Sequence, residues 1–305
     1  MNRFTNIFTI LICLLAMTAC QKEIPFTGEV AKRKLVLNGP FSPDSTWNLH
    51  LSHSLSIADT GHPRSVTTGV LRIKDAAGQL LFTLDHDSAG FYSHATEKPQ
   101  VGKTYIVEAE ATGYEMITGT DKAPAPIVVS LVDSMHTTFL SGKVLSIDLL
   151  LSDPADKDNY YVLEAEAAVY DSNGVIVDFI SPLYSYSLDP NLDVEGLGDE
   201  TSSYQRIYIK DEKFQGQNYP VNVMVSVSYL EYLLSEPYSE GASAEIFFHI
   251  RTVSKGLYQY LKSYDKYQNY SSDPTFSQPV QVYSNMKKGF GIFGGYSESV
   301  MTFSY

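Results

Sequence analysis

Cysteine is almost absent from this 305-residue sequence, which contains only Cys13 and Cys20. Both lie in the opening stretch MNRFTNIFTILICLLAMTAC, where one cation, Arg3, precedes an apolar run over 7–15. This order is typical of a secretory signal, and the small residues before Cys20 form a lipobox, where signal peptidase cuts before a lipid-bearing cysteine. We therefore expect a signal peptide over 1–19 and lipidation of Cys20. An ordinary cleaved signal is the alternative.

Removal of the signal and acylation of Cys20 leave no free thiol in the mature chain. Disulfides, cysteine–zinc sites and cysteine nucleophiles are then excluded, so packing alone must stabilise the fold. No later stretch is long and apolar enough to span a bilayer. We expect a lipid-anchored tether over 20–32 that attaches a soluble body to the outer membrane. The sequence does not decide between the periplasmic and the surface-exposed side.

Basic residues are also scarce. The chain has 22 Lys and Arg against 35 Asp and Glu, a formal net charge of −13, and removing Arg3 leaves 21 against 35, or −14. Binding nucleic acid needs clustered Lys and Arg to displace counterions, so nucleic acid is excluded as a partner. An acidic surface is also repelled by anionic lipid heads, so the acyl chains must provide the anchoring.

The composition and the strand pattern indicate a mostly β protein. Hydrophobic residues make up 44% of the chain and charged residues 19%, which is typical of a globular protein, and the length favours two domains. Trp47, Leu49 and Leu51 alternate with polar residues, the period of a half-buried strand. Short strands at roughly ten-residue spacing predict an immunoglobulin-like β-sandwich over 33–122. A proline-rich step over 121–126 marks its end.

The second half is predicted to be a β-rich domain over 127–305. Its hydrophobic period changes only near the C-terminus, where Leu257 and Leu261 recur at helical spacing after Ser254, a candidate N-cap. This pattern predicts one C-terminal helix near 254–269. The glycine-punctuated sequence after that helix predicts further β-structure.

Several short motifs follow one another along the chain: CQKEI at 20–24, LVLNG at 35–39, PQVGKTY at 99–105, ATGY at 111–114, and NMKKGFGIFGG at 285–295 after the predicted helix. Together they resemble a family of Bacteroidota lipoproteins catalogued as domain of unknown function 4249, and the resemblance covers nearly the whole chain. That family is associated with TonB-dependent outer-membrane receptors, so the resemblance implies an accessory role in uptake. It supplies no catalytic residues.

The run at 289–294 matches the literal string G-x-G-x-x-G. A dinucleotide-binding fingerprint needs that string between a strand and a helix, with an acidic residue about 20 positions later. Here the chain ends 11 residues after Gly294 and no helix follows. We interpret the glycines as tight turns that place Phe290, Ile292 and Phe293 in a core.

Metal and cofactor sites have only weak support. Asp153, Asp156 and Asp158 share one loop and could offer oxygens to calcium, although the loop lacks the glycine and distal glutamate of an EF-hand. Aspartates that cap backbone amides are the alternative. The acidic stretch 189–200 is a second weak calcium candidate. We expect no cofactor.

Tyrosine is abundant, with 22 residues against one tryptophan, and two of the tyrosines lie in an unusually long irregular segment over 181–203. Long loops on a rigid β-scaffold are where binding residues gather. The candidate binding residues there are Tyr184, Tyr186, Asp189, Asp193 and Glu195. Tyr258 is a further tyrosine that we expect to be exposed. Ordinary β-structure is the alternative explanation for the tyrosines, and the stretch 189–200 is expected to be dispensable for stability.

No nucleophile, zinc-protease or lactamase motif occurs with its supporting context. We therefore expect a protein that binds and is not an enzyme: an outer-membrane lipoprotein that acts as a non-catalytic accessory to a TonB-dependent nutrient receptor. The alternatives are a surface adhesion or structural lipoprotein, and a hydrolase whose carboxylates are not apparent in the sequence.

Overall fold

The computed structural model describes residues 32–56, 59, 61–155, 158–193, 204–235, 240–271 and 280–305. The predicted signal peptide, Cys20, Asp156 and Glu195 lie outside these ranges, as does the predicted tether up to its last residue. Residues 33–54 and 63–305 form one compact unit, described below. Within the described ranges, no helix is both long and apolar enough to cross a membrane.

The first half consists of antiparallel strands, and the alternation predicted from the sequence is confirmed. The strands are β1 (Leu35–Phe41), β2 (Asn48–His53), β3 (Val70–Asp75), β4 (Leu80–His86), β5 (Phe91–Ser93), β6 (Thr104–Glu110) and β7 (Ile117–Lys122). They are hydrogen-bonded in the order β1-β2-β5-β4-β3-β6-β7. Trp47, Leu49 and Leu51 are buried together with Tyr105 and Val107 in one core.

Over its described residues, the second half adds a separate four-stranded sheet and two helices, and its other strands continue the first-half sheet through the last strand of the chain. Its elements are β8 (Val128–Phe139), β9 (Gly142–Ser152), β10 (Tyr160–Tyr170), β11 (Ile176–Leu183), β12 (Ser185–Tyr186), β13 (Ile207–Lys210), a 3₁₀ turn (Asp211–Lys213), β14 (Asn218–Ser226), α2 (Ser228–Ser235), β15 (Ser243–Val253), α3 (Lys255–Ser271) and β16 (Phe290–Ser304). One sheet has the order β12-β14-β9-β8, and the other contains β11-β10-β15-β16, with β13 paired to β10. The fold is mostly β, as predicted.

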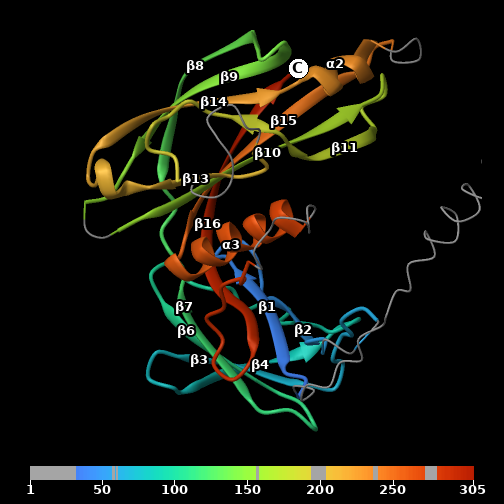
Figure 1. The fold of residues 1–305 in the computed structure, drawn as a ribbon, viewed down its shortest axis with the longest axis vertical. Helices are drawn as coiled ribbons and strands as arrows, with labels where there is room; N and C mark the ends of the chain where they lie inside the picture. The colour runs from blue at the N-terminus through green and yellow to red at the C-terminus, as the bar shows by residue number, and fades with distance from the viewer. Residues whose placement is uncertain are drawn as a thin grey trace, which may run out of the picture. The chain divides into compact units, whose positions relative to one another are not determined.

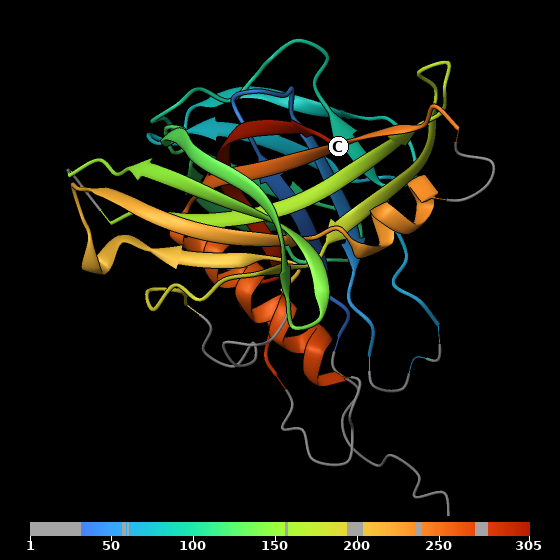
Figure 2. The same ribbon diagram turned by 90° about the horizontal axis from the view of Figure 1, so that it is seen from above.

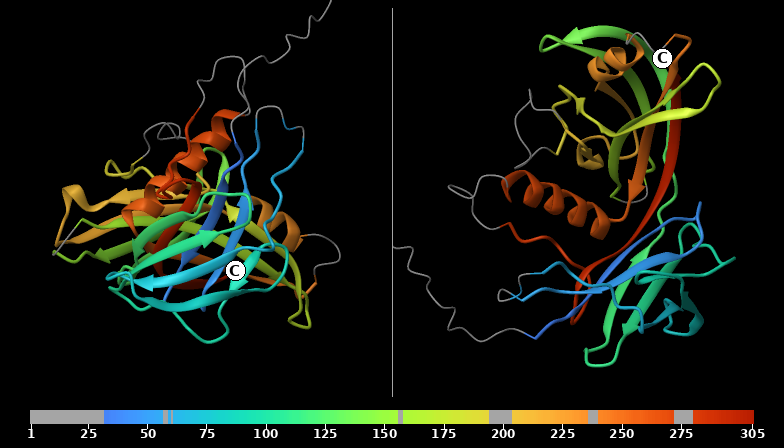
Figure 3. Two further views of the ribbon diagram at one scale, coloured as in Figure 1. Left: turned by 90° about the horizontal axis from the view of Figure 1, so that it is seen from below. Right: turned by 90° about the vertical axis from the view of Figure 1, so that its right-hand side faces the viewer.

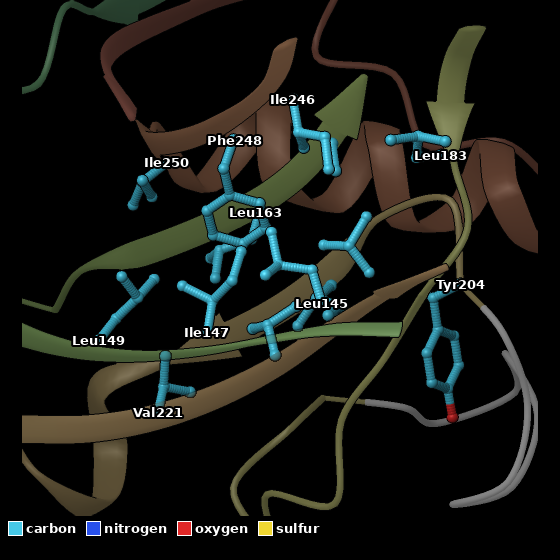
Figure 4. Packing of buried hydrophobic residues seen from close by; sticks show 14 of the residues in the cluster. Leu145, Ile147, Leu149, Leu163, Leu183, Tyr204, Val221, Ile246, Phe248 and Ile250 are labelled. Atoms are coloured by element: carbon cyan, nitrogen blue, oxygen red, sulfur yellow. The ribbon is translucent and has the colours of Figure 1, made fainter. Parts of the chain in front are cut away.

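A second core fills the space between these two sheets (Figures 2 and 4). Ile147 on β9 and Val221 on β14 face Leu163 on β10 and Phe248 on β15, and each of these side chains is at most 2% exposed. Strand residues two apart share a face, so the apolar half of each strand enters this core. On the other face, α3 packs against β10, and polar side chains of β10 and β15 lie beside it.

Strand β16 belongs to both halves of the chain (Figure 1). Over 290–295 it pairs in parallel with β1, and over 296–304 it pairs antiparallel with β15. Successive strand residues point to opposite faces, so Ile292 joins the cluster under α3 whereas Phe293 enters the first-half core. The boundary near 121–126 stays a prediction, but the core of the first half is completed by the C-terminal strand.

Helix α3 lies against β10 and β16, as predicted for a C-terminal helix (Figure 3). Ser254 is its N-cap, since the Ser254 Oγ accepts a hydrogen bond from the Leu257 N–H at 3.1 Å. Leu257 and Tyr258 pack against Val162 of β10. The expectation that Tyr258 is exposed is wrong: it is 2% exposed, because it points at the sheet.

Three local predictions fail. Helix α2 lies where only β-structure was predicted, because Leu230, Leu233 and Leu234 bury a helical face against the second core. Residues 280–285 belong to the sequence after the helix for which further β-structure was predicted, but they form no strand. The glycine run is not a set of turns but the start of β16, and Phe290 is 48% exposed instead of buried.

Candidate functional site

Two hollows flank helix α3. The first, which we call the lysine hollow, has a volume of about 380 Å³ and is lined by Asp193, Lys210, Lys255, Tyr258, Lys262 and Lys266, among others. The second, the tyrosine hollow, has a volume of about 420 Å³ and is lined by Tyr184, Tyr204, Arg206, Tyr264, Asp265 and Gln268, among others. Helix residues three and four apart are neighbours, which gives α3 a lysine-bearing face along the first hollow.

Asp193 is the central carboxylate of the lysine hollow. It accepts hydrogen bonds from Lys262, from Lys210 at 3.0 Å and from the Tyr258 hydroxyl at 2.9 Å. The side chains of Asp193 and Lys262 are both only 12% exposed. Burial raises the pKa of Asp193, but the hydrogen bonds from these three donors outweigh it and hold that pKa below the usual range. Asp193 is therefore a firmly ionised carboxylate.

A partly buried arginine, Arg206, lies in the wall of the tyrosine hollow. Arg206 pairs with Glu164 of β10 and, at 2.6 Å, with Asp265 of α3, which also accepts a hydrogen bond from the Tyr208 hydroxyl at 2.6 Å. These contacts hold the C-terminal half of α3 against β13. Above them the ring of Tyr184 is 49% exposed, so this hollow presents an aromatic side chain to solvent.

The structure brings two of the predicted binding residues to α3, Tyr184 in the tyrosine hollow and Asp193 in the lysine hollow. Tyr186 instead packs on Phe139, with ring centroids 5.2 Å apart. Asp189 accepts hydrogen bonds from the Asn191 backbone N–H and from the Tyr219 hydroxyl, which makes its role local. Burial, together with that hydrogen bond, raises the pKa of Tyr219 to about 12.

The expectation that 189–200 is dispensable is wrong for its first part. Leu192 forms a β-bridge with Ile209 and packs against the second core, and Asp193 binds three donors. Deleting these residues would leave Lys262 buried without its carboxylate. The remainder of the stretch lies outside the described residues.

Asp153, the first aspartate of the loop considered for calcium, has a structural role. Asp153 is 8% exposed and accepts hydrogen bonds from Asn159 Nδ2, from the Tyr161 hydroxyl and from the Gly216 backbone N–H. Asp158 is exposed. Nowhere in the described part of the chain do three or more His, Cys, Asp or Glu residues come together in a way that could hold a metal ion. Asp153 thus caps a backbone amide, that of Gly216, which is the alternative to calcium binding given above.

The cations of the lysine hollow were missed by the sequence analysis. One signal was present: Lys255, Lys262 and Lys266 are spaced seven and four residues apart, which places them on one face of the predicted helix. Lys210 and Arg206 carried no such signal, because their neighbours on α3 lie about 45 to 63 residues away in sequence.

Residues 21–302 match the family described as Domain of unknown function (DUF4249). The chain belongs to this family. The match spans both halves of the fold and includes every residue that lines the two hollows. No curated protein matches the chain significantly.

Two solved structures show remote likeness to this DUF4249 chain. One is a Salmonella alpha-2-macroglobulin mutant, with 9% identity and a TM-score of 0.25; the match covers 90% of this chain and 15% of the other. The second is a "putative carbohydrate binding protein" from Bacteroides uniformis, with 8% identity and a TM-score of 0.18, covering 88% of this chain and 99% of the other. These TM-scores are too low to support an inference about the fold or the function of this chain.

A charged network crosses the polar face of β10, β15 and β16 in this DUF4249 chain. Arg251 pairs with Glu164 and, at 2.6 Å, with Glu298. His249 lies between Glu166 and Glu298, with its ring nitrogens 3.1 and 3.0 Å from their carboxylates. The hydrogen bond to Glu298 is the largest influence on the imidazole and raises the pKa of His249, against the opposing effect of burial.

His249 is expected to make stability depend on pH. Its folded pKa lies above the unfolded value of about 6.5, so its stabilisation is complete below that pH and is lost as pH rises through the folded pKa. Urea unfolding should show the parent chain losing ~1 kcal/mol more than His249→Gln between pH 6 and pH 8.5. Parallel pH profiles for the two chains would contradict this assignment.

Proposed function

We propose that this DUF4249 chain is a lipid-anchored, non-catalytic binding protein of the outer membrane that serves as an accessory to a TonB-dependent receptor. The observation that carries the proposal is that Tyr184 and Asp193 both lie beside α3. Both residues come from the irregular segment over 181–203, which is longer than a turn requires. Family membership, the lipobox at Cys20 and the family's association with such receptors support the same role.

The surface beside α3 has the character of a binding face. Tyr184 is 49% and Tyr264 is 37% exposed, and aromatic side chains with polar neighbours are enriched at protein interfaces. Arg206 and Asp265 beneath them are paired, so the rings rest on a rigid support. Asp193 stays ionised through three donors, which makes it a poor proton donor and favours binding over acid catalysis.

An adhesion or structural role is the second candidate, favoured by one observation. The edge strand β8 exposes Val128, Val132 and Met135 at 67, 65 and 58%, and an exposed apolar edge is suited to pairing with another chain. If that role were the correct one, the full chain would assemble without any receptor, and Val132→Lys would abolish the assembly.

The anchoring part of the proposal predicts the behaviour of Cys20→Ala. Among the residues described, no helix could span a membrane, so the acyl chains are expected to be the attachment. Cell fractionation should move the variant from the membrane to the soluble fraction. Unchanged fractionation would exclude the lipid anchor.

The binding part of the proposal predicts the behaviour of the double variant Tyr184→Ala/Tyr264→Ala in a Bacteroidota host. Copurification of a TonB-dependent receptor with the chain should fall roughly tenfold, because exposed aromatic anchors contribute most of the energy of an interface. The matched control is Tyr229→Ala, which removes a 54% exposed tyrosine from α2 and should leave copurification unchanged. Equal recovery with both variants would place the contact elsewhere.

A further inference from the structure

The lysine hollow carries positive charge on an acidic protein. Four lysines, Lys210, Lys255, Lys262 and Lys266, face two carboxylates, Asp193 and Glu212, so four positive and two negative charges leave +2. The chain as a whole carries −13. A cationic hollow on such a chain concentrates anions locally, since the surrounding field would otherwise repel them.

Asp193 neutralises only part of the positive charge of these lysines. It pairs with Lys262 and Lys210, whereas the side chains of Lys266 and Lys255 form no ion pair or hydrogen bond with any described residue. Lys266 is also partly buried. Burial, and then the neighbouring charges of Lys210 and Lys266, lower the pKa of Lys262 against the effect of Asp193. The cations thus repel one another where no anion screens them.

The walls of the hollow set the size and shape of a ligand. Its volume of about 380 Å³ lies at the lower end of the range for small-molecule sites, ~300–1,000 Å³. Lys262 and Lys266 are one helical turn apart, whereas Lys255 lies 11 residues before Lys266, about 16 Å away along the helix. Between the two ends, the Tyr160 ring stands against Tyr258, with centroids 5.1 Å apart, and offers a flat apolar surface.

We propose that the lysine hollow binds a phosphate monoester, with the phosphate held by Lys266, Lys262 and Lys210 and the organic part extending past Tyr160 toward Lys255. This inference rests on the proposed function in treating the surface beside α3 as a binding face. A phosphate monoester carries close to two negative charges at neutral pH, which matches the excess of +2. Lysine ammonium groups bind phosphate as mobile point charges, without the fixed geometry of an arginine fork.

The ligand has two sources with the same chemistry: a free sugar phosphate and a lipid headgroup. The experiment uses the full lipidated chain in neutral detergent and calorimetric titration with glucose 6-phosphate, with glucose as the uncharged control. In parallel, the same chain is titrated with a water-soluble short-chain phosphatidic acid and, as the control, with the matching short-chain phosphatidylcholine. Binding of the soluble sugar ester assigns the site to a free ligand, and binding of phosphatidic acid alone assigns it to a headgroup.

The matched variants are Lys266→Met in the hollow and Lys288→Met outside it, where the lysine side chain is 67% exposed. Lys266→Met should weaken phosphate ester binding roughly tenfold, and Lys288→Met should leave it unchanged. Lys266→Arg should retain binding, because the charge is kept. The melting temperature of Lys266→Met should equal or exceed that of the parent, since the repulsion between lysines is reduced, so a loss of binding cannot come from unfolding.

Absence of binding to both glucose 6-phosphate and phosphatidic acid would overturn the inference, as would equal binding of glucose. Equal losses with Lys266→Met and Lys288→Met would also overturn it, because the attraction would then be general. None of these results depends on receptor copurification. The proposed function fails instead if no TonB-dependent receptor copurifies with the parent chain.

Discussion

The Phe293→Ala variant is expected to unfold with a free energy about 4 kcal/mol lower than that of the parent chain. Phe293 is fully buried and comes from the last strand, yet it packs inside the first-half core. Its ring centroid lies 4.6 Å from that of Phe41 and 6.1 Å from that of Trp47. Removing the ring leaves a cavity between strands that are far apart in sequence, where the backbone has little freedom to collapse.

The measurement has a built-in reporter, because Trp47 is the only tryptophan in the chain. Urea unfolding followed by Trp47 fluorescence reports the first-half core, and circular dichroism reports all of the β-structure. Both midpoints should fall in Phe293→Ala. The control is Phe290→Ala on the same strand, where the side chain is 48% exposed and the loss should be about 0.5 kcal/mol or less. An unchanged fluorescence midpoint in Phe293→Ala would show that β16 does not complete the first core.

The Gly291→Ala variant is expected to lose at least ~3 kcal/mol of stability or to fail to fold. Gly291 has a φ of +98°, and a Cβ placed there would overlap the carbonyl group of Leu37 on β1. Two costs therefore add: the backbone strain of an L-residue at positive φ, and the separation of a parallel strand pair. The same glycine belongs to the string that resembles a nucleotide fingerprint, but here its conformation is used for strand packing.

Gly78→Ala is the matched control for this variant. Gly78 has a similar φ of +83°, but nothing lies within 4 Å of an added Cβ. Its cost should therefore be the backbone strain alone, about 1–2 kcal/mol. Thermal unfolding of the two variants separates the contributions. Equal melting temperatures would mean that β1 and β16 tolerate a wider spacing than the structure shows.

The sequence by itself determined the features that depend on neighbouring residues. The buried face that carries Trp47, Leu49 and Leu51 was predicted, because alternation with a period of two is a local pattern. The Ser254 cap and the helix after it were also readable, since a cap acts within three residues of itself. Family membership followed from short motifs in the same way.

The tertiary structure alone decided where these elements meet. No local pattern shows that β16 pairs with β1 as well as β15, that Tyr258 turns inward, or that Asp193 binds Lys262. Helix α2 was missed for a related reason, since its leucines become a helical face only once the second core lies beneath them. These outcomes depend on partners about 40 to 250 residues away in sequence. The order of strands in a sheet selects those partners, and that order is set by the packing of the whole chain.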